Sequence, residues 1–238
     1  MTDPVPPPAC PPRPAAVRAF ALAGLAPQAW RNGRGLTREI LVRAAGDGGD
    51  GDGGWDWRVS VADIDEDGAF SAFDGVDRAA ALLRGPGLAL RGDARSADIA
   101  FERIGTVRRF AGETALHARL HGAPARLFNV MTRRGIATER LSAHAGAGAG
   151  ELALGDAEAA VLFVAEGRFS IEVRAAAKAG DGSSSGDSDS DSGILNRWRG
   201  ERRRDEGLSI ASGAAVLRWR SLAAGGCLLV CALRPIRP

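Results

Sequence analysis

The sequence predicts an all-β protein of 238 residues, with two jelly-roll-like β-barrels in one chain and few short helices. Three observations support this prediction. Apolar and polar residues alternate with a period of two in several short segments, which is typical of strands with one buried face. Glycine turns separate these segments, and long amphipathic helical patterns are missing. A hairpin-like pattern also occurs twice, as a duplicated barrel would leave it.

Composition is that of a globular chain with a sizeable core. Hydrophobic residues make up 45% and charged residues 25%. The net charge of +2 gives no reason to expect a nucleic acid or a membrane as a partner. Cys227 and Cys231 flank an apolar run and are expected to be buried thiols, and with Cys10 they form no readable disulfide framework.

The first 16 residues are rich in proline and are expected to form a disordered leader. They contain neither the basic start nor the apolar core of a secretory signal. No apolar stretch is long enough to span a bilayer. We therefore expect a cytoplasmic protein.

The first barrel is expected over residues 17–142. Residues 46–54 contain only glycine and aspartate and predict a loop between two strands. Residues 55–62 alternate strictly and predict a strand. A hairpin around Gly85-Pro86-Gly87 is expected at 79–90, and another strand at 128–131.

The second barrel is expected over residues 151–238, after an Ala/Gly-rich linker at 143–150. A disordered insert of Gly, Ser and Asp is predicted at 181–193. The charged segment 197–206 is a candidate surface helix. A second hairpin is expected around Glu166-Gly167, and the strands of this half are expected at 161–164, 169–173, 216–219 and 227–233.

Three segments place polar side chains where a small ligand could meet them. After Trp30 and a glycine turn, Asn32, Thr37 and Glu39 are expected to converge on one small volume. The alternative is an ordinary turn with an exposed strand edge. The other candidates lie on strand faces opposite apolar residues. Arg58 and Ser60 share one such face, and Asn129, Met131 and Arg133 share another.

If its strand face lines the mouth of a barrel, Arg58 is an anchor for a carboxylate ligand, and Asn129, Met131 and Arg133 form a wall for a small ligand. A guanidinium binds a carboxylate through two parallel hydrogen bonds, and an amide with a thioether completes a plausible wall. The alternative for Arg58 is a solvated position on the surface. The alternative for the strand with Asn129, Met131 and Arg133 is an ordinary strand that ends in a basic turn. The residues alone do not decide which face is buried.

Metal chemistry is not expected. Asp63-Ile64-Asp65-Glu66-Asp67-Gly68 imitates the start of a calcium loop, but its twelfth position is Asp74 and strands flank it instead of helices. A three-histidine centre would need His117, His121 and His144, and His144 lies in the predicted linker. No nucleophile elbow is present. We therefore expect neither a metal nor another cofactor.

Several motifs resemble, in the same order, those of the HutD/Ves family of cupin-like proteins associated with histidine utilisation. The resemblance covers Trp30 to about Gly135. The motifs are Trp30-Arg31-Asn32-Gly33-x-Gly35-x-Thr37-x-Glu39-Ile40, Trp57-Arg58-Val59-Ser60-Val61-Ala62-Asp63, Gly68-x-Phe70-Ser71-x-Phe73-x-Gly75-x-Asp77-Arg78, Phe110-x-Gly112-Glu113 and Phe128-Asn129-Val130-Met131-Thr132-Arg133-Arg134-Gly135.

The resemblance implies a bicupin without the usual metal ligands. It also implies a role in binding a small carboxylate intermediate of histidine catabolism, such as formylglutamate, to restrain flux or regulation, with Arg58 and Arg133 as carboxylate anchors. This chain departs from the family pattern at Arg34, where glycine is usual, and at Ala69 and Asp74, where prolines are common. Arg34 is expected to enlarge or block the mouth of the pocket.

Other functions remain open at this point. One alternative is an isomerase or hydrolase that acts on a related carboxylate, with Glu39 as general base if burial raises its pKa. Another is an interaction module that uses the proline-rich leader. A homodimer is also possible.

Overall fold

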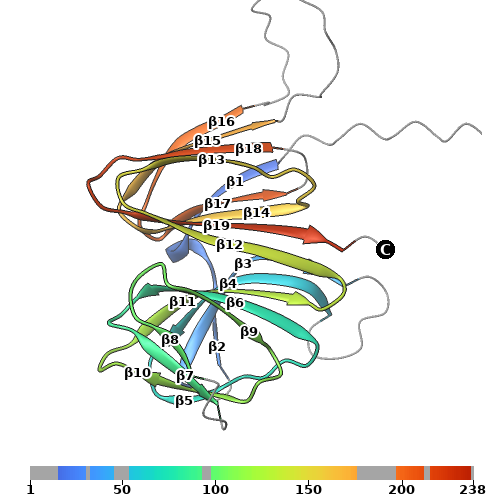
Figure 1. Ribbon diagram of the computed structural model, residues 1–238, viewed down its shortest axis with the longest axis vertical. Coiled ribbons are helices and arrows are strands. Elements are labelled where there is room, and N and C mark those ends of the chain that lie inside the picture. The colour runs from blue at the N-terminus through green and yellow to red at the C-terminus, as the bar shows by residue number, and fades with distance from the viewer. Residues whose placement is uncertain are drawn as a thin grey trace, which may run out of the picture.

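The computed structural model describes residues 16–30, 33–45, 54–92, 98–175, 197–211 and 215–236. Figure 1 shows two β-rich lobes stacked along the long axis. The predicted leader up to residue 15, most of the loop at 46–54 and the insert at 181–193 lie outside the described residues.

The first barrel consists of two antiparallel sheets. The larger has the order β2 (Pro27–Ala29), β3 (Gly35–Ala44), β4 (Trp55–Ile64), β11 (Ala125–Arg133), β6 (Val76–Arg84) and β9 (Val107–Ala111). The smaller has the order β5 (Gly68–Phe70), β10 (Leu116–Leu120), β7 (Leu88–Gly92) and β8 (Ile99–Phe101).

The second barrel has the same construction. Its larger sheet has the order β1 (Ala16–Ala21), β17 (Glu206–Ala211), β14 (Ala159–Glu166), β19 (Cys227–Pro235) and β12 (Ala137–Ala145). Its smaller sheet has the order β13 (Ala149–Ala153), β18 (Ala215–Ser221), β15 (Arg168–Ala175) and β16 (Arg197–Arg203). The 3-10 turn η1 (Leu22–Gly24) follows β1, and no helix in the described part of the chain is able to cross a membrane.

The two barrels repeat one eight-stranded unit. The orders β4-β11-β6-β9 and β5-β10-β7-β8 correspond, strand for strand, to β12-β19-β14-β17 and β13-β18-β15-β16. Strands β2 and β3 extend the first unit, and β1 extends the second. The prediction of two jelly-roll-like barrels in an all-β chain is therefore confirmed.

The larger sheets of the two barrels pack face to face. Trp57, Val59 and Val61 of β4 lie in a buried cluster that also contains residues of β12, β14 and β19, and the ring centroids of Phe128 and Phe163 are 5.8 Å apart. The alternation in β4 is thus confirmed as a buried apolar face, and this face is buried between the barrels.

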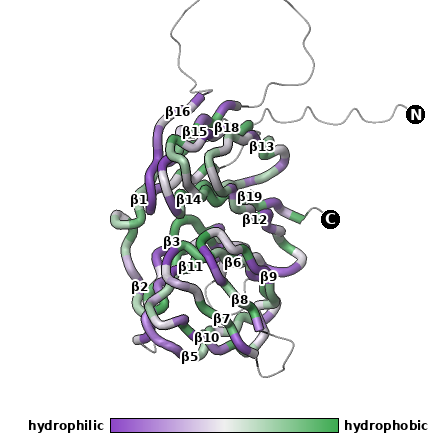
Figure 2. The backbone as a smooth tube through the Cα atoms, turned by 60° about the vertical axis from the view of Figure 1, so that its left-hand side comes forward, coloured by the Kyte–Doolittle hydropathy of each residue, from purple (hydrophilic) through white to green (hydrophobic). Residues whose placement is uncertain are grey.

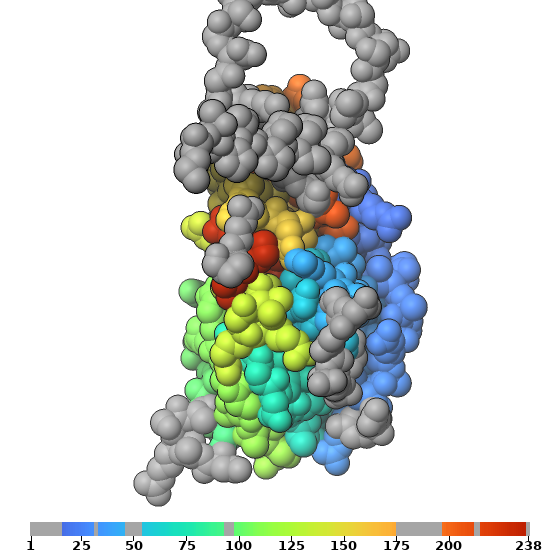
Figure 3. Space-filling model, turned by 90° about the vertical axis from the view of Figure 1, so that its right-hand side faces the viewer, coloured from blue at the N-terminus to red at the C-terminus, as the bar shows by residue number. Residues whose placement is uncertain are grey.

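The structure corrects where two elements belong. Strand β1 pairs with β17, so the N-terminal strand joins the second barrel and not the first. Figure 3 shows the blue N-terminal residues along one side of both lobes. Strand β12 pairs with β19, so the second barrel begins at Ala137, and of the predicted linker only residues 146–148 lie between strands.

Both predicted hairpins are wrong. Strands β6 and β7 lie in different sheets of the first barrel, and β14 and β15 lie in different sheets of the second. The glycine turns at Gly85 and Gly167 are therefore corners from one sheet to the other. A glycine turn looks the same in a hairpin and at a corner, because pairing partners are distant in sequence.

The predicted surface helix at 197–206 is also wrong. Arg197–Arg203 form the edge strand β16, in which exposed and half-buried residues alternate. Figure 2 shows this strand as hydrophilic. Charged side chains on an edge strand discourage pairing with another chain.

Candidate functional site

The first barrel has an open cavity of about 820 Å³ against the inner face of its larger sheet. Alternation in β4 places Arg58, Ser60 and Ala62 on this face, because the intervening residues point toward the second barrel. The wall of the cavity is formed by Gln28, Ala29, Trp30, Thr37, Glu39, Val42, Ala44, Gly54, Trp55, Arg58, Ser60, Ala62, Phe70, Ser71, Ala72, Phe73, Arg78, Asn129 and Met131.

Six of the eight residues expected at the site meet in this cavity. Ser60 of β4 lies opposite Asn129 of β11, and Arg58 lies opposite Met131 in the next inward-facing row. Thr37 and Glu39 reach the cavity from β3. Polar groups from three strands therefore converge, as the sequence pattern predicts, while their role in binding stays a prediction.

The other two expected residues are Asn32 and Arg133, and of these the structure describes only Arg133. Asn32 lies outside the described residues. Arg133 is at the end of β11, where its Nε donates to the carbonyl oxygen of Trp55 over 3.4 Å and its guanidinium lies 6.0 Å from the centroid of the Trp55 ring. The structure thus does not place Arg133 as a second anchor in the cavity.

Arg78 of β6 is the functional candidate that the sequence reasoning missed. It is 5% exposed and lines the cavity. Its Nη1 donates to the carbonyl oxygen of Ser71 over 3.0 Å, and its Nη2 donates to Asn129 Oδ1 over 3.1 Å. Its Nε has no hydrogen-bond partner. The available signal was an arginine placed directly before an apolar run, Ala79 to Leu83.

Aromatic rings surround this guanidinium. Its carbon atom lies 4.4 Å from the centroid of Phe70, 5.1 Å from that of Phe110 and 5.5 Å from that of Phe73. Burial lowers the pKa of Arg78 to about 9, so the side chain stays charged at neutral pH. Among the described residues, no carboxylate forms an ion pair with it. Cation–π contacts stabilise the charge without neutralising it.

The second cavity arginine has a weak internal partner. Arg58 Nε lies 3.1 Å from Glu39 Oε2, yet the contact lacks hydrogen-bond geometry and Nε has no hydrogen-bond partner. Elsewhere on the same sheet Arg38 Nη1 lies 2.6 Å from Asp63 Oδ2 and makes a true hydrogen bond. The Arg58 guanidinium therefore keeps donors for another acceptor.

Thr37 and Arg34 both have structural partners. The indole nitrogen of Trp30 donates to Thr37 Oγ1 over 2.8 Å, so this hydroxyl acts as an acceptor within the protein. Arg34 donates from Nη1 to the carbonyl oxygen of Asp67 over 2.7 Å and lies against Gly68. Arg34 is not part of the cavity wall, so the expected enlargement or blockage does not follow from this position.

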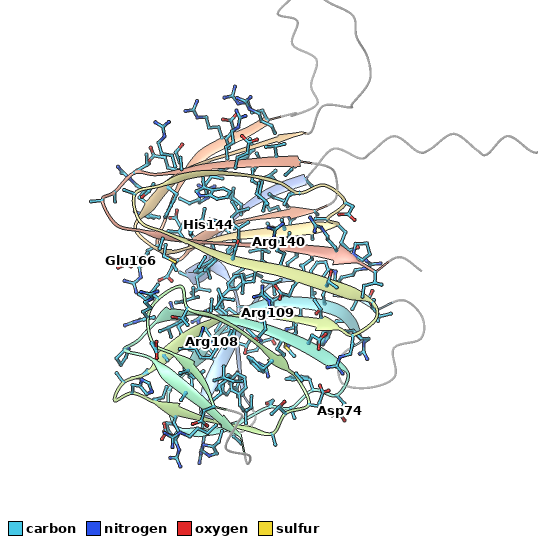
Figure 4. All side chains as sticks on the ribbon, viewed as in Figure 1. Asp74, Arg108, Arg109, Arg140, His144 and Glu166 are labelled. Carbon is cyan, nitrogen blue, oxygen red and sulfur yellow. The ribbon has the colours of Figure 1, made fainter. Side chains whose placement is uncertain are left out.

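The acidic turn and the histidines do not assemble a metal site. Asp63 binds Arg126 as well as Arg38, and Asp67 accepts from the backbone nitrogen of Leu120. His144 lies on β12 of the second barrel (Figure 4), where its ring centroid is 4.6 Å from that of Trp219. In the described ranges no group of three or more His, Cys, Asp or Glu side chains is placed to hold a metal ion.

The cavity wall carries more cationic than anionic groups, with Arg58 and Arg78 against the single carboxylate of Glu39 among the described lining residues. Its donors are two guanidinium groups and the Asn129 amide, whose oxygen accepts from Arg78 and whose NH₂ group is left for a ligand. Its apolar wall includes Trp55, Phe70 and Met131. Placed polar groups beside apolar side chains are typical of small-molecule sites.

Comparison with known proteins gives a consistent family. A family model described as HutD matches residues 23–188. An uncharacterized 21.2 kDa protein in the hutC 3′ region of Pseudomonas putida is 38% identical over 104 residues, which are 43% of this chain and 50% of that protein. Protein Ves of Citrobacter koseri is 38% identical over 109 residues, 44% of this chain and 52% of that protein. The chain thus spans about half the length of these curated relatives.

Solved structures agree over most of the chain. A conserved protein of unknown function from Pseudomonas aeruginosa PAO1 has a TM-score of 0.70 and 25% identity, with 92% of this chain and 99% of that chain covered. HutD from Pseudomonas fluorescens SBW25 has a TM-score of 0.68 and 21% identity, with 93% and 100% covered. Oxalate decarboxylase from Lactobacillus farciminis shares the cupin-like fold alone, with a TM-score of 0.55 and 8% identity over 92% of this chain and 86% of that chain.

Proposed function

The chain belongs to the HutD family, and from this premise we propose that its first barrel binds a small carboxylate. The proposed ligand is an intermediate of histidine catabolism such as formylglutamate, and the proposed role is regulatory. The relatives named HutD, and the one named for its place in the hutC 3′ region, support the link to histidine utilisation.

The uncompensated charge of Arg78 is the observation that carries this proposal. A buried cation without a counter-ion is costly, and its Nε has no hydrogen-bond partner. A carboxylate in the cavity would supply both the missing charge and the missing acceptor. Charge-assisted hydrogen bonds of this kind are about twice as strong as neutral ones.

The spacing of the two arginines favours a ligand with two acidic groups. Arg58 and Arg78 lie on β4 and β6, which pair with opposite edges of β11, and both are opposite Met131. Neighbouring strands are about 4.8 Å apart, so the two backbones are separated by roughly 10 Å. A short dicarboxylate spans such a gap, and its middle would lie beside Asn129 and Ser60, where an amide or formyl group finds partners.

The geometry favours binding over catalysis. A general base at Glu39 would need a desolvated carboxylate near the reacting atom. The Glu39 side chain is 36% exposed and lies against the Arg58 guanidinium. This is the arrangement of an ion pair, so we propose a binding protein, with the isomerase or hydrolase as the alternative.

The test combines a screen with one substitution. A thermal-shift screen of histidine-pathway compounds and short dicarboxylates, followed by calorimetry, is expected to find a ligand, because binding to the folded state raises the melting temperature. Arg78→Met should then weaken binding by about 2 kcal/mol or more, roughly thirtyfold, through loss of charged hydrogen bonds. Methionine fills similar space, so folding should persist.

A matched control is Arg119→Met. Arg119 is an exposed arginine that pairs with Asp67 outside the cavity, with 56% of its side chain accessible. This variant should bind like the wild type. Equal affinity of wild type and Arg78→Met for every hit would refute the proposed site.

A further inference from the structure

The contact between Glu39 and Arg58 places a carboxylate of the protein itself in the wall of a cavity built for carboxylates. The atoms are 3.1 Å apart, and the pair is only partly shielded, with 36% of the Glu39 side chain and 21% of the Arg58 side chain exposed. Among the described residues, Arg58 makes no hydrogen bond. Glu39 therefore supplies charge without using the donors of the guanidinium.

Regular strand pairing brings Glu39 to this place. Glu39 of β3 pairs with Ser60 of β4, and Thr37 pairs with Ala62, so both β3 side chains share the cavity-facing side of the sheet. The pairing of β3 with β4 shifts register only after this point, between Glu39 and Leu41. Strand β3 also lies outside the eight-stranded unit that the two barrels share. The position of Glu39 is thus an addition to the barrel and no part of its basic construction.

We infer that Glu39 is an internal competitor that an incoming carboxylate displaces from Arg58. This inference rests on the proposed function, in which an anion binds in the first barrel. A ligand carboxylate makes hydrogen bonds with the guanidinium that Glu39 does not make. The exchange is therefore favourable for a ligand that also reaches Arg78, whereas an anion that reaches only Arg58 gains little. Glu39 in this way lowers the affinity of every anion that uses Arg58, so at low concentration only a ligand with a second anchor binds.

The experiment compares Glu39→Gln with the wild type in calorimetric titrations with glutarate and with acetate. Glutamine has nearly the same size as glutamate and lacks its negative charge. We expect Glu39→Gln to bind glutarate about two- to fivefold more tightly, as for removal of a partly exposed ion pair. Acetate should gain at least as much, so the preference for glutarate should not rise. Unchanged glutarate binding would overturn the inference, because Glu39 would then not compete for Arg58. Weaker glutarate binding would also overturn it, because Glu39 would then contribute to recognition of the ligand.

Glu66→Gln is the matched control. Glu66 is an exposed residue between β4 and β5, outside the cavity wall, and its substitution removes the same charge. Its affinity for glutarate should equal that of the wild type. An equal gain in both variants would reduce the effect to net charge and overturn the inference.

A second measurement does not need a ligand to bind. Phenylglyoxal labels guanidinium groups, and peptide mapping by mass spectrometry reports the labelling of Arg58 alone. Glu39→Gln should speed the labelling of Arg58 and leave Arg78 unchanged. If glutarate binds to no variant, the proposed function loses its support. If Arg58 is labelled at the same rate in the wild type and in Glu39→Gln, the inference that Glu39 competes for Arg58 is refuted independently of ligand binding.

Discussion

At the scale of single residues, the site depends on polar groups that face the cavity from β4, β6 and β11, whose opposite faces are apolar. Arg78 stands among Ala79, Ala80 and Ala81, and all three alanines are fully buried. Of these, Ala80 lies on the same face of β6 as Arg78, and its small side chain leaves room for the guanidinium. Asn129 then fixes one end of this guanidinium by accepting from Nη2. The two residues therefore form one unit.

Asn129→Leu tests this unit. The change removes the acceptor for Arg78 and the free NH₂ group while it keeps the approximate size. Ligand affinity should fall about tenfold, as expected for a neutral hydrogen bond together with a less well-placed arginine. Calorimetry with the screened ligand measures the effect.

Thr132→Val is the control on the same strand. Thr132 is buried, and its hydroxyl makes only a 3.5 Å contact with the carbonyl oxygen of Asp77. It does not line the cavity. An equal loss of affinity in this variant would mean that β11 as a whole, and not the Asn129 amide, determines binding.

At the scale of elements, the corners between sheets show how the barrel unit was repeated. The pairing of β6 with β11 skips Leu83, and the pairing of β14 with β19 skips Ala165. A bulge thus precedes the glycine of each corner, at Gly85 and at Gly167. Shared bulges are strong signs of common construction, because they are features of the fold and not defects.

Gly85→Ala should destabilise the first barrel. Gly85 has φ of +103°, and a Cβ atom there would lie 2.7 Å from the carbonyl oxygen of Pro124. We expect a loss of about 1–3 kcal/mol in the free energy of unfolding, measured by chemical denaturation. In Gly24→Ala the new Cβ meets nothing within 4 Å, so its effect should stay within about 0.5 kcal/mol. Equal stability of Gly85→Ala and wild type would contradict the strained corner.

At the scale of the whole molecule, the two barrels share a construction but differ in their interiors. Alignment of the two corners places Arg78 at the position of Ala160. The same register places Asn129 at Val230 and Met131 at Ala232. These residues of the second barrel belong to a buried apolar cluster. The first barrel therefore holds the candidate site, and the second is filled by aliphatic packing at these positions.

The second barrel also supports the first through a large apolar contact. Cys227 and Cys231 of β19 lie in the cluster between the barrels, and Cys227 is 2% exposed. Burial raises the pKa of Cys227 to about 11 and raises that of Cys231 as well. Thiolates are the reactive form of cysteine, so both side chains should be inert while the barrels stay together.

Thiol labelling measures this contact. In a Cys10→Ser variant at mildly alkaline pH, a thiol reagent should react with neither Cys227 nor Cys231 in the native protein. Both should react in concentrated guanidinium chloride. Fast labelling of either residue under native conditions would show that the barrels separate, and would contradict a single packed molecule.

The sequence by itself determined the all-β class, the two-barrel construction and six residues of the cavity wall. These follow from local patterns: period-two alternation in β4 and β11, and motifs that resemble one family in their order. Arg58, Ser60, Asn129 and Met131 were found because each shares a strand face with another polar residue. The alternation and the motifs that identify these residues each span only a few residues of the chain.

Only the tertiary structure decided which faces are buried and what they meet. Both faces of β4 are buried, one in the cavity and one against the second barrel, and alternation alone does not distinguish them. Strand pairing also decided that the glycine turns are corners, that β1 and β12 belong to the second barrel, and that Arg78 and not Arg133 enters the cavity. The physical reason is that pairing and packing join residues far apart in sequence, so no local pattern contains them.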